Sequence, residues 1–251
     1  MIQLVLVGCA GRMGRVIAEC VAARDDCRIA AGVDRVSRGD EGFPVYASCE
    51  EITEQADAVI DFSHPSALRG TLDFACARTI PVVMATTGLD EEHKALLQQA
   101  AQTIPVFTSA NMSVGINLIS DLCAKAAQIL EDGYDIEIVE AHHNQKLDAP
   151  SGTALMLADA IVGACKEPKT LEYDRHSKRQ KRTREEIGMH AIRGGTITGE
   201  HSVIFAGRDE IITISHSARS REVFAVGALR AALFLVGKKP GNYCMSDLIH
   251  A

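Results

Sequence analysis

The stretch Leu4-Val5-Leu6-Val7-Gly8-Cys9-Ala10-Gly11-Arg12-Met13-Gly14 decides the fold of this chain. An apolar run of strand length leads into glycines with the spacing Gly-x-x-Gly-x-x-Gly, and a helical pattern follows over residues 12–23. Glycines at such a turn let the backbone approach a pyrophosphate, whose charge then lies at the helix N-terminus. The spacing differs from the commoner Gly-x-Gly-x-x-Gly, but the flanking strand and helix are the context that such a motif requires. We therefore expect the loop to bind a dinucleotide through Gly8, Cys9, Ala10, Gly11, Arg12, Met13 and Gly14.

The first hundred residues alternate apolar runs of strand length with helical patterns. The strands are expected at residues 2–7, 28–33, 58–62, 81–84 and 104–107, and the helices at 12–23, 67–78 and 91–102. Continuous apolar strands that alternate with helices indicate a parallel sheet covered on both faces. The predicted fold class is α/β, with a Rossmann-like dinucleotide-binding domain.

Three further segments complete the expected cofactor site. Asp34 ends the second predicted strand, where an acid usually binds the ribose hydroxyls of NAD. Arg35 could pair with the 2′-phosphate of NADP, whereas we interpret Arg38 as a surface arginine. Two loops follow later strands, where ligands of open α/β sheets bind. Their expected cofactor contacts are Ala85, Thr86, Thr87, Ser109, Ala110, Asn111 and Met112. The cofactor is NADH or NADPH, and the sequence leaves the preference between them open.

The pattern changes after residue 115. A helix is expected at 116–130, then a strand at 135–140, a helix at 154–161, and strands at 187–192, 196–205 and 210–215 with glycine-rich turns between them. This arrangement indicates a mixed or antiparallel second sheet. An apolar helix at 222–236 would return to the first domain. We therefore expect a dinucleotide-binding domain from residues 1–113 and 222–251, and a second, α+β domain from 114–221.

The stretch Glu140-Ala-His-His-Asn-Gln-Lys-Leu-Asp-Ala-Pro-Ser-Gly-Thr153 carries two imidazoles and an ammonium ahead of a predicted helix start. The first backbone N–H groups of a helix have no intrahelical partner, so such an end binds anions, carboxylates included. These groups suit a small substrate with more than one carboxylate and a step that needs a proton.

The same stretch, continued to Ala154, resembles the signature of the 4-hydroxy-tetrahydrodipicolinate reductase (dihydrodipicolinate reductase) family of the diaminopimelate and lysine pathway. Other matching segments are Gly-x-x-Gly-Arg-Met-Gly, Asp61-Phe62-Ser63, Thr86-Thr87-Gly88 and Arg193-x-Gly195-x-x-x-Gly199-Glu-His201. The resemblance implies reduction of a cyclic, unsaturated dicarboxylate by NADH or NADPH, and a homotetramer built through the second domain's sheet. The chain departs from the family at His64, where relatives carry Arg, and at Met112, where an aromatic residue is frequent.

Within this resemblance the residues of the stretch receive roles. His142 is the expected general acid, because imidazole titrates close to neutral pH. Lys146 would stabilise the developing negative charge or hold the donor in place. A substrate carboxylate would be bound by His143, Ser151, Gly152 and Thr153. Arg221 at the domain junction is a weaker candidate for substrate binding.

Composition narrows the function further. A formal charge of −7 gives no reason to expect nucleic acid or an anionic membrane as a partner. The apolar runs are too short to span a bilayer, and the N-terminus lacks a basic region, so we expect a cytoplasmic enzyme. The eight cysteines are scattered without a Cys-x-x-Cys pair, which favours buried thiols over a disulfide frame or a metal site. We interpret the basic run at residues 175–184 as a solvated, mobile loop rather than a polyanion site.

Two other functions remain as alternatives. A non-catalytic NAD(P)-binding sensor would need the glycine loop but not Lys146 or the Ser-Gly-Thr helix start. Another two-domain dehydrogenase, for example one acting on an amino acid, would share the first half and differ after residue 115. The His-His-x-x-Lys stretch favours the reductase over both. The oligomeric state and the extent of domain closure do not follow from the residues alone.

Overall fold

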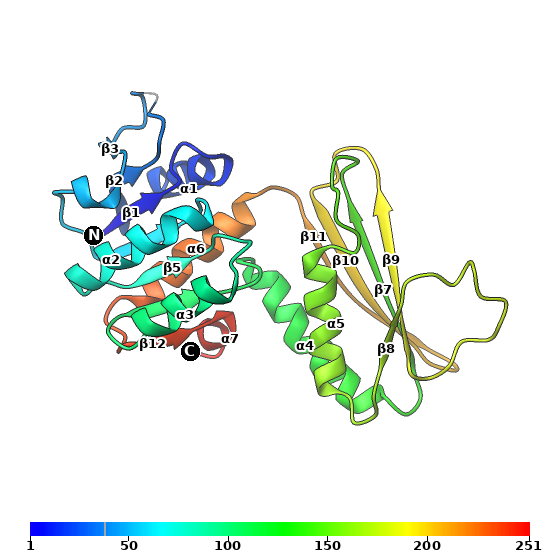
Figure 1. Ribbon diagram of the computed structural model, residues 1–251. Helices are drawn as coiled ribbons and strands as arrows, with labels where there is room; N and C mark the ends of the chain where they lie inside the picture. The colour runs from blue at the N-terminus through cyan, green and yellow to red at the C-terminus, as the bar shows by residue number, and fades with distance from the viewer. Residues whose placement is uncertain (38) are drawn as a thin grey trace. The chain divides into compact units, whose positions relative to one another are not determined.

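The computed structural model describes residues 1–37 and 39–251, so the expectation for Arg38 lies outside the described residues. The chain forms two compact units (Figure 1). The first unit comprises Met1–Val114 and Arg221–Ala251, and the second comprises Gly115–Ser220. Each unit has its own sheet and its own apolar core.

The first unit contains a seven-stranded parallel sheet with the order β12-β6-β5-β4-β1-β2-β3. Its strands are β1 (Ile2–Val7), β2 (Cys27–Val33), β3 (Val45–Tyr46), β4 (Ala58–Asp61), β5 (Val82–Met84), β6 (Pro105–Thr108) and β12 (Gly241–Tyr243). After β1 the chain adds β2 on one side, and β4 then pairs with β1 on the other side. The carboxyl end of β1 is therefore the topological switch point, where open α/β sheets bind ligands.

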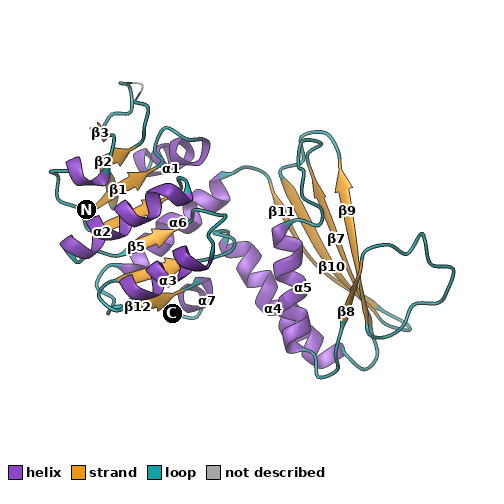
Figure 2. Ribbon diagram, viewed as in Figure 1, coloured by secondary structure: helices purple, strands orange, loops and turns teal. Residues whose placement is uncertain are grey.

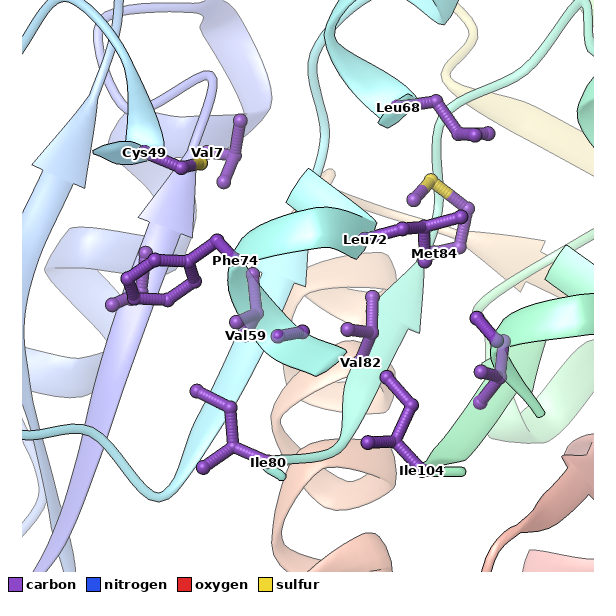
Figure 3. Close-up of a cluster of buried hydrophobic side chains, with 14 of the residues drawn as sticks. Val7, Cys49, Val59, Leu68, Leu72, Phe74, Ile80, Val82, Met84 and Ile104 are labelled. Carbon is purple, nitrogen blue, oxygen red and sulfur yellow. The ribbon is translucent and has the colours of Figure 1, made fainter. Parts of the chain in front are cut away.

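Helices cover both faces of this sheet (Figure 2). They are α1 (Arg12–Ala22), α2 (Leu68–Arg78), α3 (Glu91–Ala100), α6 (Glu222–Leu235), α7 (Met245–Ile249) and the 3₁₀ turns η1 (Cys49–Glu51) and η2 (Pro65–Ala67). Alternate residues of each central strand enter different cores, since Val5 packs with α2 and α3, and Leu4 packs with α1 and α6. Figure 3 shows the first of these cores, in which Val59 and Val82 of the sheet lie beneath Leu72 and Phe74 of α2.

The second unit contains a five-stranded mixed sheet with the order β11-β10-β7-β9-β8. Its strands are β7 (Asp135–His142), β8 (Thr170–Glu172), β9 (Glu186–Arg193), β10 (Gly199–Ala206) and β11 (Ile211–Ala218). β7 is parallel to β9 and antiparallel to β10. Helices α4 (Val114–Leu130) and α5 (Gly152–Ala164) pack on one face of this sheet (Figure 1). The prediction of a parallel sheet and a second, mixed sheet is confirmed.

The structure corrects several local predictions. The strand expected at 196–205 begins only at Gly199, and β7 continues to His142, so the candidate acid lies on a strand. The prediction missed β3, β8, β12 and α7, because elements of two to five residues carry too little periodicity and are stabilised by pairing or packing with neighbours.

The basic run at residues 175–184 is a loop with mostly exposed residues, as expected, but three of its cations are held by ion pairs. Arg175, Lys178 and Arg182 form ion pairs with carboxylates of β9, β8 and β7, respectively. These pairs hold the run against the edge of the second sheet.

All eight cysteines are free thiols. The expectation that they are buried is only partly right. Four are buried, namely Cys9, Cys27, Cys49 and Cys123, whereas Cys244 is exposed.

Candidate active site

Two side chains of β7 form the centre of the site in the second unit. Glu140 and His142 are two residues apart on one strand, so both point to the face that carries α4 and α5. His142 Nδ1 lies 2.6 Å from Glu140 Oε2, and both side chains are almost fully buried. The imidazole is therefore held through one nitrogen, and Nε2 is left for chemistry.

The Glu140 carboxylate also accepts hydrogen bonds from two segments outside its own strand. Arg193 of β9 donates from Nη1 to Oε2 at 2.8 Å and from Nη2 to Oε1 at 2.7 Å, and the backbone N–H of Ser151 donates to Oε1 at 3.0 Å. Burial alone would raise the pKa of Glu140, but the bonds from Arg193, His142 and Ser151 outweigh it and lower the pKa below its ordinary value. Glu140 is thus a buried anion with a full set of donors.

A second histidine packs against His142. The His201 ring, on β10, makes an edge-to-face contact with the His142 ring, with the centroids 5.1 Å apart. His201 Nε2 lies 3.0 Å from Ser151 Oγ. Burial, together with the charge of His142, lowers the pKa of His201 to about 4, so this ring is neutral at physiological pH.

Helix α5 begins beside these groups. Ser151 is its N-cap, and the Ser151 hydroxyl accepts the backbone N–H of Ala154 at 3.1 Å. The exposed Gly152 is the first residue of the helix. The first turn presents backbone N–H groups and the positive end of the helix dipole, which favour a carboxylate. The structure therefore brings the candidate acid and the candidate anion site together within one unit.

The loop between β7 and α5 carries the other two cations of the stretch. The Lys146 ammonium lies 2.9 Å from Asp148 Oδ1, and its hydrogen bond lowers the pKa of Asp148. His143 Nδ1 accepts the backbone N–H of Gln145 at 3.2 Å. Lys146 was expected to stabilise negative charge on the substrate or to hold the proton donor, His142, whereas in the structure it pairs with Asp148. To neutralise a ligand carboxylate, Lys146 would have to exchange Asp148 for that ligand.

The glycine loop of the first unit has the geometry of a phosphate cradle. Gly8 adopts a φ of +83°, and a Cβ at this position would lie 2.5 Å from the carbonyl oxygen of Phe62. A Cβ on Gly14 would lie 2.2 Å from the carbonyl oxygen of Gly8. Gly11 is the N-cap of α1 and has no side chain of its own to cap the helix. These residues fit a dinucleotide pyrophosphate at the start of α1.

A cavity of about 500 Å³ adjoins this loop at the carboxyl ends of β1, β2 and β4. Its lining includes the expected Gly8, Gly11, Asp34 and Arg35, and also His64 of the loop after β4. His64 Nδ1 accepts the backbone N–H of Ser66 at 3.2 Å, which fixes the orientation of the ring. The departure from the family at this position therefore places an imidazole in the wall of the cavity.

The loops after β4 and β5 are joined by a buried carboxylate. Asp61 accepts the hydroxyls of Ser63 at 2.6 Å, Thr71 at 2.8 Å and Thr86 at 2.8 Å. The Thr86 hydroxyl also accepts the backbone N–H of Ser63, so it serves this network rather than a ligand. Ala85 is half-buried and Thr87 is exposed.

The third expected cofactor loop follows β6. Ser109 Oγ donates to the carbonyl oxygen of Asn111 at 2.7 Å, and Asn111 Oδ1 accepts the backbone N–H of Ser113 at 2.8 Å. Ala110 between them is exposed. The loop is thus held by its own side chains.

Two of the expected cofactor residues turn their side chains into a core. The Met112 side chain is 4% exposed and packs in the core beneath α6. The Cys9 side chain enters the same core, and burial raises its pKa to about 11. Cys9 can therefore contribute only its backbone to the loop, and its thiol is inert. Of the remaining loop residues, Arg12 is exposed, whereas Ala10 and Met13 are half-buried.

Sequence reasoning missed Glu140, Arg193 and His201 as site residues. A signal existed for Glu140, because it has the same strand phase as the buried Ile136 and Ile138. A carboxylate at a core position needs a partner, and this marks a site candidate. His201 carried a similar signal, because it has the strand phase of the buried Val203 and Phe205. Arg193 carried none, because only the pairing of β7 with β9 brings it to Glu140.

No group of three or more His, Cys, Asp and Glu side chains within residues 1–37 and 39–251 is arranged to hold a metal ion. In the same ranges, no helix is long and apolar enough to cross a membrane.

Comparison with known proteins gives consistent results over both units. Residues 2–112 match the family model described as dihydrodipicolinate reductase, N-terminus, and residues 115–249 match its C-terminus. The 4-hydroxy-tetrahydrodipicolinate reductase of Caldanaerobacter subterraneus subsp. tengcongensis is 53% identical over 99% of this chain and 98% of its own. The protein of the same name from Clostridium tetani is 46% identical over 100% and 98%. A dipicolinate-bound dihydrodipicolinate reductase from Paenisporosarcina sp. TG-14 has the same fold, with a TM-score of 0.81, 23% identity and coverage of 98% and 99%.

Proposed function

Because the chain belongs to the dihydrodipicolinate reductase family, we propose that it reduces a cyclic unsaturated dicarboxylate at the site around His142 with NADH or NADPH. The substrate is 4-hydroxy-tetrahydrodipicolinate and the product is tetrahydrodipicolinate. The observation that carries the proposal is the placement of a buried, carboxylate-held imidazole beside the start of α5. A sensor that only binds a dinucleotide has no use for a proton donor next to an anion site.

In this proposal the substrate is held by its carboxylates. One carboxylate accepts the N–H groups at the start of α5, with Ser151, Gly152 and Thr153 around it. His143 and Lys146 neutralise the negative charge, and Lys146 leaves Asp148 to do so. Positive groups supplied locally are needed, because the chain as a whole carries a formal charge of −7.

The bound dinucleotide supplies a hydride to one carbon of the conjugated C=C–C=N system. The neighbouring carbon then carries carbanion or enamine character and takes up a proton. His142 delivers this proton from Nε2 while Glu140 holds Nδ1, and the imidazole recovers a proton from solvent after the product leaves. The conjugated system arises when 4-hydroxy-tetrahydrodipicolinate loses its 4-hydroxyl group and a neighbouring hydrogen as water. Hydride and proton together then account for the two hydrogens that the dehydrated substrate gains, and the products are tetrahydrodipicolinate, the oxidised dinucleotide and water.

The cofactor is assigned to the first unit. The pyrophosphate takes the start of α1 within the glycine loop, with the adenosine half in the cavity that Asp34, Arg35 and His64 line. The loop residues Ala85, Thr87, Ala110 and Asn111 would then lie on the nicotinamide side, since ligands of open sheets lie beyond the strand ends.

We assign oligomerisation to the face of the second sheet that lies opposite α4 and α5. Ile192 and Ile211 point to this face and are 51% and 69% exposed, and the half-buried Val139 and Ile204 lie between them. Apolar side chains on an open sheet face suit a subunit interface, here a homotetramer. The eight free thiols suit the reducing cytoplasm. Light scattering on the purified protein tests the tetramer.

The test of the activity is a spectrophotometric assay. Substrate is generated in the cuvette from aspartate semialdehyde and pyruvate by a condensing enzyme, and the oxidation of NADH or NADPH is followed. The proposal requires oxidation that depends on both the condensing enzyme and this protein. Oxidation with an amino acid or a polyol in place of that substrate would favour another dehydrogenase, and binding of NADH without turnover would favour a sensor.

A further inference from the structure

We propose that Glu140 is a positioning residue for the reaction, which keeps the proton of His142 on Nδ1 and leaves Nε2 as the atom that delivers a proton to substrate. Arg193 in turn keeps Glu140 ionised and oriented. This inference rests on the proposed function and extends it to two residues outside the set that binds substrate.

Glu140 is held as an anion by its donors. Its carboxylate accepts both Nη groups of Arg193 in a two-pronged pair, and it also accepts the backbone N–H of Ser151. A guanidinium fork of this kind stabilises an ionised carboxylate. An ionised carboxylate has only acceptor atoms. The 2.6 Å contact with His142 Nδ1 therefore requires a proton on Nδ1.

Because Nδ1 of His142 carries its proton in both the neutral and the charged imidazole, Nε2 is the nitrogen that gains and loses one. Gly199 lies beside this atom, and a Cβ there would be 3.1 Å from Nε2. The site thus leaves room at the nitrogen that performs the proposed transfer.

His201 and Arg193 are the other neighbours of the pair formed by His142 and Glu140. His201 contacts His142 edge to face and is neutral, so it adds no opposing charge. Arg193 is the guanidinium paired with Glu140, and its Nη2 also donates to the carbonyl oxygen of Asp148 at 2.6 Å. The same guanidinium therefore connects Glu140 with the loop that carries Lys146.

These contacts make Glu140→Gln a sharp test. The amide oxygen of Gln can still accept the Ser151 N–H and one Arg193 group, so the start of α5 keeps its anchor. The amide NH₂, however, faces His142 Nδ1 as a donor and favours the tautomer with the proton on Nε2 and none on Nδ1. Neutral Nε2–H is a far weaker acid than imidazolium. The loss of the carboxylate also destabilises the imidazolium form.

We therefore expect Glu140→Gln to lower kcat by about 10²–10⁴-fold, the range found when a group that orients a catalytic histidine is removed. The dissociation constants of NADH and of pyridine-2,6-dicarboxylate should change by less than about threefold. The pH at which kcat is half-maximal should move downward. Glu140→Asp, which keeps the charge, should recover part of the rate.

The matched control is Glu186→Gln. Glu186 is also a buried glutamate paired with an arginine, but it lies at the other end of β9 from Arg193 and has no histidine partner among the described residues. It should lose comparable stability in thermal unfolding and keep kcat within about threefold. Equal losses of kcat in both variants would show a general effect on the sheet and overturn the proposal.

A readout independent of activity is the ¹⁵N resonance pair of the His142 ring in the intact protein. Wild type should show the neutral ring protonated at Nδ1, and Glu140→Gln should show a shift toward Nε2. An unchanged tautomer, or near-normal kcat in Glu140→Gln, contradicts the role of Glu140.

His142→Gln, measured in parallel, distinguishes a failure of the positioning role of Glu140 from a failure of the proposed reductase mechanism. If it is severely impaired while Glu140→Gln is not, the reductase assignment stands and only the positioning role fails. If His142→Gln turns over normally, His142 is not the acid and both fail.

Discussion

The backbone N–H of Ala10 donates a hydrogen bond of 3.0 Å to Asp34 Oδ2. This bond joins the glycine loop after β1 to the carboxyl end of β2, so one oxygen of Asp34 shapes the loop. Among residues 1–37 and 39–251, the hydrogen bond to Oδ1 is a long one of 3.4 Å from the backbone N–H of Val36. It retains capacity for a ribose hydroxyl, since a carboxylate offers about four acceptor positions.

From this arrangement we expect the enzyme to use both NADH and NADPH, with kcat/KM values within about a thousandfold, or about 4 kcal/mol. The carboxylate of Asp34 favours the free ribose hydroxyls of NADH, and Arg35 beside it favours a 2′-phosphate. Arg35→Ala should lower kcat/KM for NADPH about tenfold and leave NADH nearly unchanged. Arg24→Ala, which removes the exposed pair with Asp26 at the other end of α1, is the control. A larger loss with NADH would contradict the assignment of Arg35.

His142→Gln and Lys146→Ala should each lower kcat by about a hundredfold or more, because one removes the proton donor and the other a charge at the reacting dicarboxylate. Steady-state kinetics and NADH binding by fluorescence measure the two effects separately. NADH affinity should stay within about threefold, since the glycine loop belongs to the other unit. Turnover near wild type in either variant would remove that residue from the mechanism.

Pyridine-2,6-dicarboxylate should compete with substrate by placing one carboxylate at the start of α5. Thr153→Val keeps the shape of the side chain and removes its hydroxyl, so inhibition should weaken by about 1–3 kcal/mol. Inhibition constants and NADH dissociation constants are compared for wild type, Thr153→Val and the control Thr170→Val on β8. Weakening in the control alone, or a loss confined to NADH, would place the carboxylate elsewhere.

His201 should make the second unit sensitive to acid. Burial lowers the pKa of His201 to about 4, whereas the unfolded chain has the ordinary value of about 6.5. Between these values the unfolded state binds the additional proton, so the free energy of unfolding falls as the pH falls from about 6.5 to about 4. His201 Nδ1 is buried without a hydrogen-bond partner in the described part of the chain. A proton added to this atom would therefore have no acceptor, which makes protonation of the folded protein unfavourable.

The corresponding variant is His201→Asn. In this variant the free energy of unfolding should no longer fall by the amount that His201 contributes, about 3 kcal/mol between pH 6.5 and pH 4. The variant should also be less stable than wild type at pH 7. Urea unfolding at several pH values measures the difference in slope, with the exposed His176→Asn as control. Parallel curves for wild type and His201→Asn would mean that His201 titrates normally in the folded protein.

Much of the site was predictable because it rests on local backbone geometry. The glycine loop, the acid at the end of β2 and the start of α5 each follow from residues within a few positions of one another. The strand alternation of β7 also placed Ile136 and Ile138 in the core. The burial of the Met112 and Cys9 side chains could not be predicted, because a short loop sequence does not indicate which side chains turn into the core.

The sequence by itself determined the two kinds of sheet, the glycine loop after β1 and the family of the chain, since glycine spacing, residue alternation and helix caps act on the nearest neighbours. Only the tertiary structure decided the state of His142. Arg193 meets Glu140 across 53 residues, and His201 meets Ser151 across 50. The register of β7 with β9 and β10 determines which of these residues are in contact. A proton can be held on one chosen nitrogen of an imidazole only where a buried charge and its partners have been brought to it by that register.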